Sequence, residues 1–330
     1  EPDRVPAIAE AVDRLGVPTY LSGMARGLLG ARHPLHCRHQ RRAALKRADL
    51  VILAGVPCDF RLDYGRSIGK GATLISANRS RQDLKLNRNP DIAVPADPGC
   101  LLVDLARAAP AAAGAWSDWR EKLATRDAAR EEEIDQQGAA AGERVNPVAL
   151  CRAVNEALPE DSVVVADGGD FVGTASYIVR PRAPLTWLDP GAFGTLGVGA
   201  GFALGAKLCR PEAEVWIMFG DGSLGYSIAE FDTFIRHELP VIAVVGNDAC
   251  WSQIAREQVK LLEDDTAVML GRTDYHRVVA GFGAGGLLIE RDDESADVLA
   301  LARDVAAGGH AVLVNALLDR SDFREGSISM

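Results

Sequence analysis

The feature that most constrains the fold is a strand–loop–helix–strand unit in the C-terminal half of the chain. The apolar run 214–219 leads directly into Gly-Asp-Gly at 220–222, and the apolar run 241–245 leads into Asn-Asp at 247–248. The intervening residues 224–237 have a helical pattern, which predicts two parallel strands joined by a right-handed crossover. Both loops would then lie at the carboxyl ends of the strands, the edge where open α/β sheets bind ligands.

The rest of the chain shows the same alternation of short apolar runs with helical patterns. The predicted fold class is therefore α/β, with two parallel-sheet domains, the first of them Rossmann-like. We expect a first domain at 1–110 without its natural beginning, a linker with a charged helix at 111–145, and a second domain at 146–330. Further strands are predicted at 17–21, 50–54, 73–76, 163–166, 287–289 and 311–314, and helices at 6–15, 40–47, 100–108, 118–136 and from an N-cap at Asn146.

Composition excludes several classes of protein. The chain has 330 residues, 48% of them hydrophobic and 25% charged, which suits about two folded domains rather than a disordered chain. Its net charge of −10 argues against a general nucleic-acid-binding protein. No apolar window of the roughly 18–20 residues that span a bilayer is present, and no apolar leader follows Glu1, so we expect a cytoplasmic protein. The six scattered cysteines indicate reduced thiols.

The two loops carry side chains that suit a metal-bridged diphosphate. Mg²⁺ prefers oxygen ligands, and Asp221 offers a carboxylate while Asn247 offers a neutral amide oxygen. Gly220 and Gly222 allow the backbone to approach phosphates closely, and the helix that follows would direct free N–H groups toward them. The alternative is an ordinary Asp-Gly turn and an unrelated Asn. The spacing and the strand context favour the metal site.

Gly-Asp-Gly, then about two dozen residues, then Asn resembles the signature of thiamine diphosphate enzymes. Neighbouring stretches resemble the acetolactate-synthase-like group, which includes the second type of 2-hydroxyacyl-CoA lyase. These stretches are residues 21–30, 53–65, 167–173, 189–201, 220–233 and 322–327. The resemblance extends over nearly the whole chain. It implies the central and diphosphate-binding domains of such an enzyme, with thiamine diphosphate and Mg²⁺ as cofactors.

The resemblance also implies a role for each residue of the site. The side chains of Asp221 and Asn247 and the carbonyl of Ala249 would bind Mg²⁺. The diphosphate would contact the second loop and the Gly-Asp-Gly loop, that is Gly168, Gly169, Asp170, Phe171, Gly220, Gly222 and Ser223.

The segment 194–196 is similar to the turn that bends the cofactor in this family. The carbonyl of Gly194 would accept a hydrogen bond from the 4′-amino group, and Leu196 would lie between the two rings; both are candidate catalytic residues. The alternative for Leu196 is an ordinary core position. Trp251, with Gln253, should border the cofactor or substrate, and a packing role for Trp251 stays open. The glycines at 197–201 favour close helix–sheet packing over a dinucleotide fingerprint, which would have to follow a strand directly.

Three hypotheses for function follow. The first is C–C cleavage of a 2-hydroxyacyl-CoA, the second is acetolactate-synthase-like condensation of 2-oxo acids, and the third is a non-catalytic cofactor-binding subunit. Such enzymes assemble as homodimers or homotetramers and use a pyrimidine domain, whose glutamate these 330 residues lack. We therefore expect the chain alone to be inactive.

In the central domain, residues 76–78 depart from the pattern of FAD-binding relatives, which leaves ADP or CoA open as its ligand. The histidines at 33, 36 and 39 are interpreted as a polar loop rather than a metal cluster.

Overall fold

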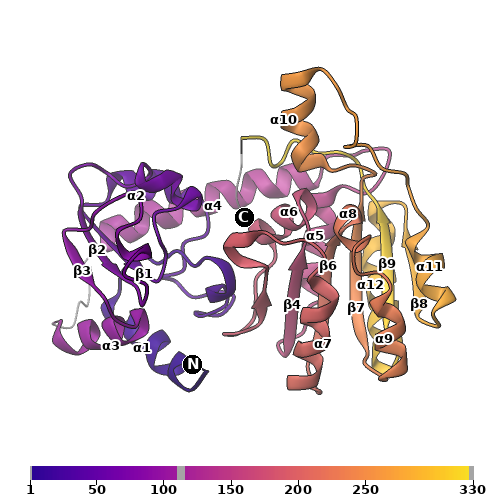
Figure 1. The fold of residues 1–330 in the computed structure, drawn as a ribbon, viewed down its shortest axis with the longest axis horizontal. Coiled ribbons are helices and arrows are strands. Elements are labelled where there is room, and N and C mark those ends of the chain that lie inside the picture. The colour runs from indigo at the N-terminus through magenta and orange to yellow at the C-terminus, as the bar shows by residue number, and fades with distance from the viewer. Residues whose placement is uncertain (1, 110–115, 327–330) are drawn as a thin grey trace. The chain divides into compact units, whose positions relative to one another are not determined.

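The computed structural model describes residues 2–109 and 116–326, which form two compact units (Figure 1). The first unit comprises residues 2–21 and 32–132 and the second comprises residues 22–31 and 133–326. Both contain a parallel sheet with helices, so the predicted α/β class with two parallel-sheet domains is confirmed. Part of the predicted linker lies outside the described residues, and the predicted domain boundaries stay a prediction.

The first unit contains a three-stranded parallel sheet in the order β1-β2-β3. Its elements are α1 (Val5–Leu15), α2 (Arg41–Arg47), β1 (Leu50–Ala54), β2 (Thr73–Ala77), β3 (Ile92–Val94) and α3 (Pro98–Ala108). The predicted strand at 17–21 is wrong, because only an isolated bridge between Thr19 and His36 forms there. Pro18 has no N–H to donate, which disfavours a regular ladder at that point. Strand β3 was not predicted, since three residues give too little pattern.

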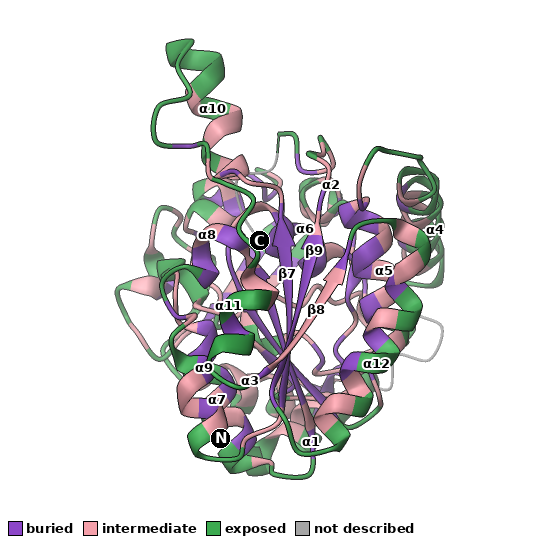
Figure 2. Ribbon diagram, turned by 90° about the vertical axis from the view of Figure 1, so that its right-hand side faces the viewer, coloured by how far each residue is buried: buried purple, intermediate pink, exposed green. Residues whose placement is uncertain are grey.

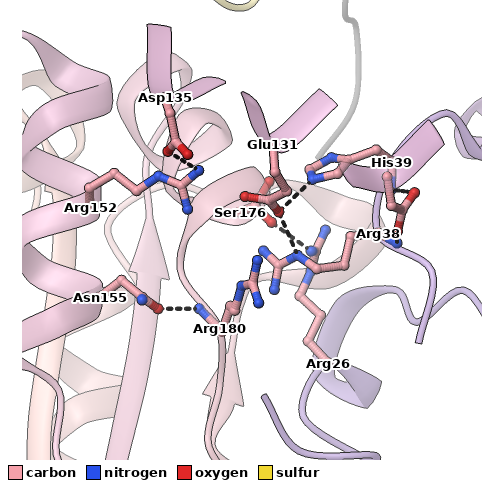
Figure 3. A network of polar contacts seen from close by, with 10 residues as sticks. Arg26, Arg38, His39, Glu131, Asp135, Arg152, Asn155, Ser176 and Arg180 are labelled. Carbon is pink, nitrogen blue, oxygen red and sulfur yellow. Dashed lines mark hydrogen bonds and ion pairs between the residues drawn. The ribbon is translucent and has the colours of Figure 1, made fainter. Parts of the chain in front are cut away.

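Helix α4 (Ser117–Gly138) confirms the predicted charged helix and contains the boundary between the two units. In its first-unit part, Glu131 Oε1 lies 2.8 Å from Nε2 of the buried His39. In its second-unit part, Asp135 Oδ1 lies 2.7 Å from Arg152 Nη2 (Figure 3). The helix is therefore held by polar side-chain contacts in each unit separately.

Polar contacts also tie residues 22–31 to the second unit. Arg26 Nη1 donates to the Ser176 carbonyl over 2.8 Å, and the guanidinium of Arg26 lies 5.5 Å from the centre of the Trp187 ring. Nearby, the backbone N–H of Arg180 donates to Asn155 Oδ1 over 2.9 Å (Figure 3). A stretch that precedes the first unit's sheet in sequence therefore belongs to the second unit in space.

The second unit is built on a six-stranded sheet in the order β5-β4-β6-β7-β9-β8, in which every pair is parallel. The strands are β4 (Ser162–Asp167), β5 (Trp187–Leu188), β6 (Glu214–Gly220), β7 (Val241–Asn247), β8 (Gly285–Ile289) and β9 (Val312–Leu317). These confirm the five predicted strands, and the two-residue β5 was not predicted.

Helices cover both faces of this sheet, and its central strands β4, β6, β7 and β9 are buried except at the ends of β6 and β9 (Figure 2). The helices of this unit are α5 (Pro147–Ala157), α6 (Asp170–Ile178), α7 (Gly199–Cys209), α8 (Asp221–Leu224), α9 (Glu230–Arg236), α10 (Ser252–Leu262), α11 (Tyr275–Gly281) and α12 (Ser295–Ala307). Helix α10 extends away from the sheet (Figure 1). The core on one face joins the strands to α7, α8, α9 and α11. On the other face, α6 and α12 contact the sheet, and α5 contacts both of these helices. Short 3₁₀ turns lie at Pro2–Arg4, Gly23–Ala25, Phe60–Gly65, Asp83–Lys85, Gly191–Phe193 and Asp292–Glu294.

Two sequence expectations about helices have different outcomes. Asn146 caps α5 as predicted, because its side chain accepts from the N–H of Val148 over 2.9 Å. The single helix predicted over 224–237 is wrong, since a turn at 225–229 separates α8 from α9. Among the described residues, no helix has the length and apolar character needed to cross a membrane.

The strand order changes direction at β4. The chain continues from β4 to β5 on one side and then returns to place β6 on the other. Such a switch opens a crevice at the carboxyl edge of the sheet. The register aligns Asp167 with Phe219 and Gly220 with Gly246, so β4, β6 and β7 end side by side. This arrangement brings three loops to one edge.

The close packing behind this edge can be tested at Gly246 of β7. A Cβ added there would lie 2.3 Å from the ring of Phe171, so we expect Gly246→Ala to lower the free energy of unfolding by about 1–3 kcal/mol. Gly205 of α7 is the matched control, because it is exposed and a Cβ there meets nothing within 4 Å. Gly205→Ala should raise stability by about 0.5–1 kcal/mol through helix propensity. Urea unfolding measures both, and equal effects would contradict the packing argument.

Candidate functional site

Three loops meet at the carboxyl edge of the second sheet, after β4, β6 and β7. The buried Ser223 holds two of them together, because its hydroxyl lies 2.6 Å from the Asp167 carbonyl and 2.9 Å from the Gly220 carbonyl. Gly168 has a φ of +152°, and a Cβ there would lie 2.7 Å from the Gly220 nitrogen. Only glycine fits such a close approach of two backbones. The structure therefore brings the predicted loops at 168–171 and 220–223 into contact.

Two buried side-chain oxygens at this edge have no hydrogen-bond partner among the described residues. They are Oδ2 of Asp221 and Oδ1 of Asn247, and these two residues are 3% and 0% exposed. The other ends of both side chains are engaged: Asp221 Oδ1 accepts from the Gly222 N–H over 2.7 Å, and Asn247 Nδ2 donates twice. Because a buried oxygen without a partner is costly, this pair fits a site that is completed by a cation.

Ala249, the third predicted ligand, has a left-handed backbone with φ of +56°. Its carbonyl accepts from the Leu270 N–H over 2.9 Å, which leaves one lone pair of that oxygen for another partner. A non-glycine residue in this conformation is uncommon outside special turns and functional loops.

The electrostatics of the edge favour a cation. Burial, and then the neighbouring carboxylate of Asp248, raise the pKa of Asp221 to about 7. Burial also raises the pKa of Asp248, whose Oδ2 accepts from the Ser252 hydroxyl. A buried and a half-buried carboxyl group in one place disfavour the doubly ionised state unless a positive charge compensates them.

Asp167 is a functional candidate that the sequence did not single out. Its fully buried carboxylate accepts from the Gly197 N–H over 3.1 Å and from the Gly199 N–H over 2.7 Å. Burial raises its pKa, and these backbone donors oppose the shift. The residue at the end of β4 therefore holds the segment that follows Leu196, at the start of α7. The only signal in the sequence was a carboxylate at the end of an apolar strand.

The predicted ring-contacting residues directly precede the residues that Asp167 holds. Gly194 ends a 3₁₀ turn with φ of +60° and is exposed. Leu196 is half-buried and is absent from the buried core, so its side chain retains exposed surface. Their proposed roles stay predictions, and the local conformation is compatible with them.

Trp251 packs directly over the Gly-Asp-Gly loop. A Cβ added to Gly222 would lie 2.4 Å from the Trp251 ring, whose centroid is 6.3 Å from that of Tyr226. The Gln253 side chain lies over Gly169, and its Oε1 would be 3.5 Å from a Cβ added to that glycine. Trp251 therefore has a packing role, and its predicted contact with a cofactor or substrate stays a prediction.

Several predicted diphosphate-contacting residues use their side chains elsewhere. The carboxylate of Asp170 pairs with Arg256 Nη2 at 2.6 Å, and the ring of Phe171 is buried against Gly246. The hydroxyl of Ser223 is engaged by the two carbonyls described above. The groups of these residues that a ligand could contact are therefore backbone N–H groups in the first turns of α6 and α8.

The histidines and cysteines provide no competing site. His39 pairs with Glu131, and His33 Nε2 lies 3.4 Å from Asp13 Oδ1. Within residues 2–109 and 116–326, no group of three or more His, Cys, Asp or Glu side chains could hold a metal ion. All six cysteines are free thiols. The mixed carboxylate, amide and carbonyl set at β6 and β7 is therefore the candidate that the structure supports.

The raised pKa of Asp221 makes stability depend on pH. Between its ordinary value and about 7, the folded chain holds a proton on Asp221 that the unfolded chain releases, so this contribution to stability falls as pH rises. In metal-free buffer, we expect Asp221→Asn to raise the melting temperature more at pH 8 than at pH 5. The exposed Asp265→Asn is the control, with equal effects at both pH values. A Tm gain for Asp221→Asn that does not depend on pH would refute this account.

The tie made by Asp167 predicts a loss of stability on truncation. Asp167→Ala would leave the buried N–H groups of Gly197 and Gly199 without acceptors, at about 1–3 kcal/mol each. Hydrogen exchange at Gly197 and Gly199 should then accelerate more than exchange in β9. Asp292→Ala is the control, because Asp292 also accepts a backbone N–H, that of Asn146, over 2.8 Å. Uniform acceleration in both variants would argue against a specific role for Asp167.

Two family models match this chain. "Thiamine pyrophosphate enzyme, C-terminal TPP binding domain" matches residues 167–316, and "Thiamine pyrophosphate enzyme, central domain" matches residues 2–105. The first range contains all three loops of the site.

Curated proteins and a solved structure agree. The chain is 52% identical to 2-hydroxyacyl-CoA lyase 2 of Bos taurus over 97% of this chain and 52% of that protein, and 51% identical to the Homo sapiens protein over 100% of this chain and 53% of that protein. It is 34% identical to a probable acetolactate synthase of Mycobacterium bovis, over 96% of this chain and 57% of that protein. The chain thus spans about half the length of these relatives. The fold matches a Rhodococcus jostii thiamine diphosphate-dependent 4-hydroxybenzoylformate decarboxylase with a TM-score of 0.74 at 18% identity, over 96% of this chain and 59% of that chain. The chain belongs to the thiamine pyrophosphate enzyme family.

Proposed function

We propose that the carboxyl edge of the second sheet binds the diphosphate of thiamine diphosphate through a magnesium ion. The observation that carries this proposal is the pair of buried oxygens without partners, Asp221 Oδ2 and Asn247 Oδ1. One carboxylate, one amide oxygen and the Ala249 carbonyl form a hard, oxygen-only ligand set. Mg²⁺ takes few ligands from protein and the rest from phosphate and water, so this set suits it.

The diphosphate is proposed to lie against backbone N–H groups at Gly168–Phe171 and Gly220–Ser223, because the side chains of Asp170, Phe171 and Ser223 are engaged elsewhere. Helix α6 begins at Asp170, and its first-turn N–H groups have no partner within the helix. The carboxylate of Asp170 would repel a diphosphate, but the Arg256 guanidinium at 2.6 Å compensates its charge.

The rings are proposed to lie along residues 194–196, directly before the residues that Asp167 holds. The Gly194 carbonyl would accept from the 4′-amino group, and the half-buried Leu196 would separate the two rings. When bound, thiamine diphosphate supplies the electron sink for C–C bond chemistry next to a carbonyl. The protein's own part there is to fix the orientation of the rings and to exclude water.

For the reaction, we propose lyase cleavage of the C–C bond of a 2-hydroxyacyl-CoA. The support is the 51–52% identity to the Bos taurus and Homo sapiens proteins named 2-hydroxyacyl-CoA lyase 2, against 34% to a probable acetolactate synthase. Condensation of 2-oxo acids is the second candidate. For the whole protein we propose a homodimer or homotetramer whose active sites are formed between subunits. We also propose that the reaction needs a pyrimidine domain, and we expect no turnover without one.

Calorimetric titration of thiamine diphosphate in Mg²⁺ tests the binding proposal. Removing a residue that only orients a metal ligand lowers metal affinity about 10–100-fold, and removing the ligand itself should cost at least as much. We therefore expect Asp221→Ala and Asn247→Ala to weaken binding at least about 10-fold. The exposed Asp265→Ala should bind like the wild type. Unchanged affinity in both ligand variants would eliminate the site.

A parallel assay separates the reactions. With 2-hydroxyacyl-CoA and with pyruvate as substrates, release of formyl-CoA supports the lyase and acetolactate supports the condensation. Cofactor binding without either product, also when a pyrimidine domain is supplied, would favour the non-catalytic subunit.

A further inference from the structure

Strand β9 carries one amide side chain in an otherwise apolar run. Asn315 is 0% exposed and lies between Val314 and Ala316, which are equally buried. A buried amide is costly unless its hydrogen bonds are made, and an aliphatic residue would suit the strand better. The reason for an asparagine at this position should therefore lie in its contacts.

Those contacts lead to the proposed metal site. Asn315 Oδ1 accepts from Asn247 Nδ2 over 3.2 Å. Asn315 Nδ2 donates to the Thr273 carbonyl over 3.1 Å and lies 3.4 Å from His276 Nδ1. Asn247 Nδ2 also donates to the Thr273 carbonyl, over 3.1 Å. The two amides thus share one backbone carbonyl.

This shared carbonyl fixes how both amides are turned. A carbonyl oxygen only accepts hydrogen bonds, so both Nδ2 atoms must face Thr273. The second proton on Asn247 Nδ2 then goes to Asn315 Oδ1, and both protons are used. Asn247 Oδ1 is left at the opposite end of the amide, and this is the buried atom without a partner.

We propose that Asn315 is a positioning residue that holds the Asn247 amide with its oxygen, rather than its nitrogen, toward the cation. This inference rests on the proposed role of Asn247 as a ligand. Without the acceptor on Asn315, one proton of Asn247 Nδ2 has no partner, and a turned amide would present an N–H donor to the cation. Outer partners of this kind orient metal ligands and affect affinity about 10–100-fold when removed.

The test measures Mn²⁺ binding, in place of Mg²⁺, from the paramagnetic resonance signal of the free ion at saturating thiamine diphosphate. We expect Asn315→Leu, which has a similar volume and no acceptor, to weaken Mn²⁺ binding at least about 10-fold. Asn315→Asp keeps an oxygen toward Asn247 Nδ2 but loses the donor to the Thr273 carbonyl, so it should bind Mn²⁺ more tightly than Asn315→Leu. A merely structural role would not separate these two variants.

Asn155→Leu is the matched control. Asn155 is also buried, at 7% exposed, and accepts the backbone N–H of Arg180, but it lies on α5 away from the three loops. This variant should lose thermal stability and keep its Mn²⁺ affinity. Should Asn315→Leu fail to fold, Asn315→Ala supplies the same comparison.

Asn247→Ala separates failure of this inference from failure of the proposed function. If Asn247→Ala loses Mn²⁺ and folded Asn315→Leu binds like the wild type, the positioning role is overturned and the ligand role stands. If Asn247→Ala binds Mn²⁺ like the wild type, or the wild-type chain shows no saturable binding, the proposed site fails and this inference fails with it.

Discussion

The parallel register of β4, β6 and β7 is the constraint on which the rest of the structure depends. These strands end level with one another, so loops that lie far apart in sequence meet at one edge. The departure of the chain to β5 on the opposite side leaves that edge open at β4. Ser223 and Gly168 then join the loops after β4 and β6 by close contacts.

The site is costly for the fold that carries it. Asp221 and Asn247 each bury an oxygen without a partner, and burial raises the pKa of Asp221. Such features lower stability, and they persist only where the packing around them holds the side chains in place. Here the surroundings are the fully buried strands of the sheet, which contribute apolar burial on both faces.

Sequence patterns predicted the second sheet because its strands are long apolar runs that end in recognisable loops. Asp221 and Asn247 could be selected for the same reason, since each directly follows such a run. Local patterns failed where they were short or interrupted, as at 17–21 with Pro18 and at the turn after Gly225, where weak helix formers divide the predicted helix.

The supporting residues could not be predicted, because their partners are distant along the chain. Asp167 holds Gly197 across 30 residues, and Asn247 meets Asn315 across 68. Only the folded sheet brings these groups together. In the sequence, Asn315 is a polar residue in an apolar run, and its neighbours in sequence do not indicate which residue its side chain contacts.

The hydrogen bonds of Ser223 and Asp167 have a consequence for the thermodynamics of recognition. They order the loops after β4 and β6 and residues 197–199 by contacts within the chain itself. The conformational entropy of these loops is therefore lost when the chain folds rather than when a ligand arrives. An incoming molecule meets backbone groups that are already in place, and little of its interaction energy is diverted to ordering the protein.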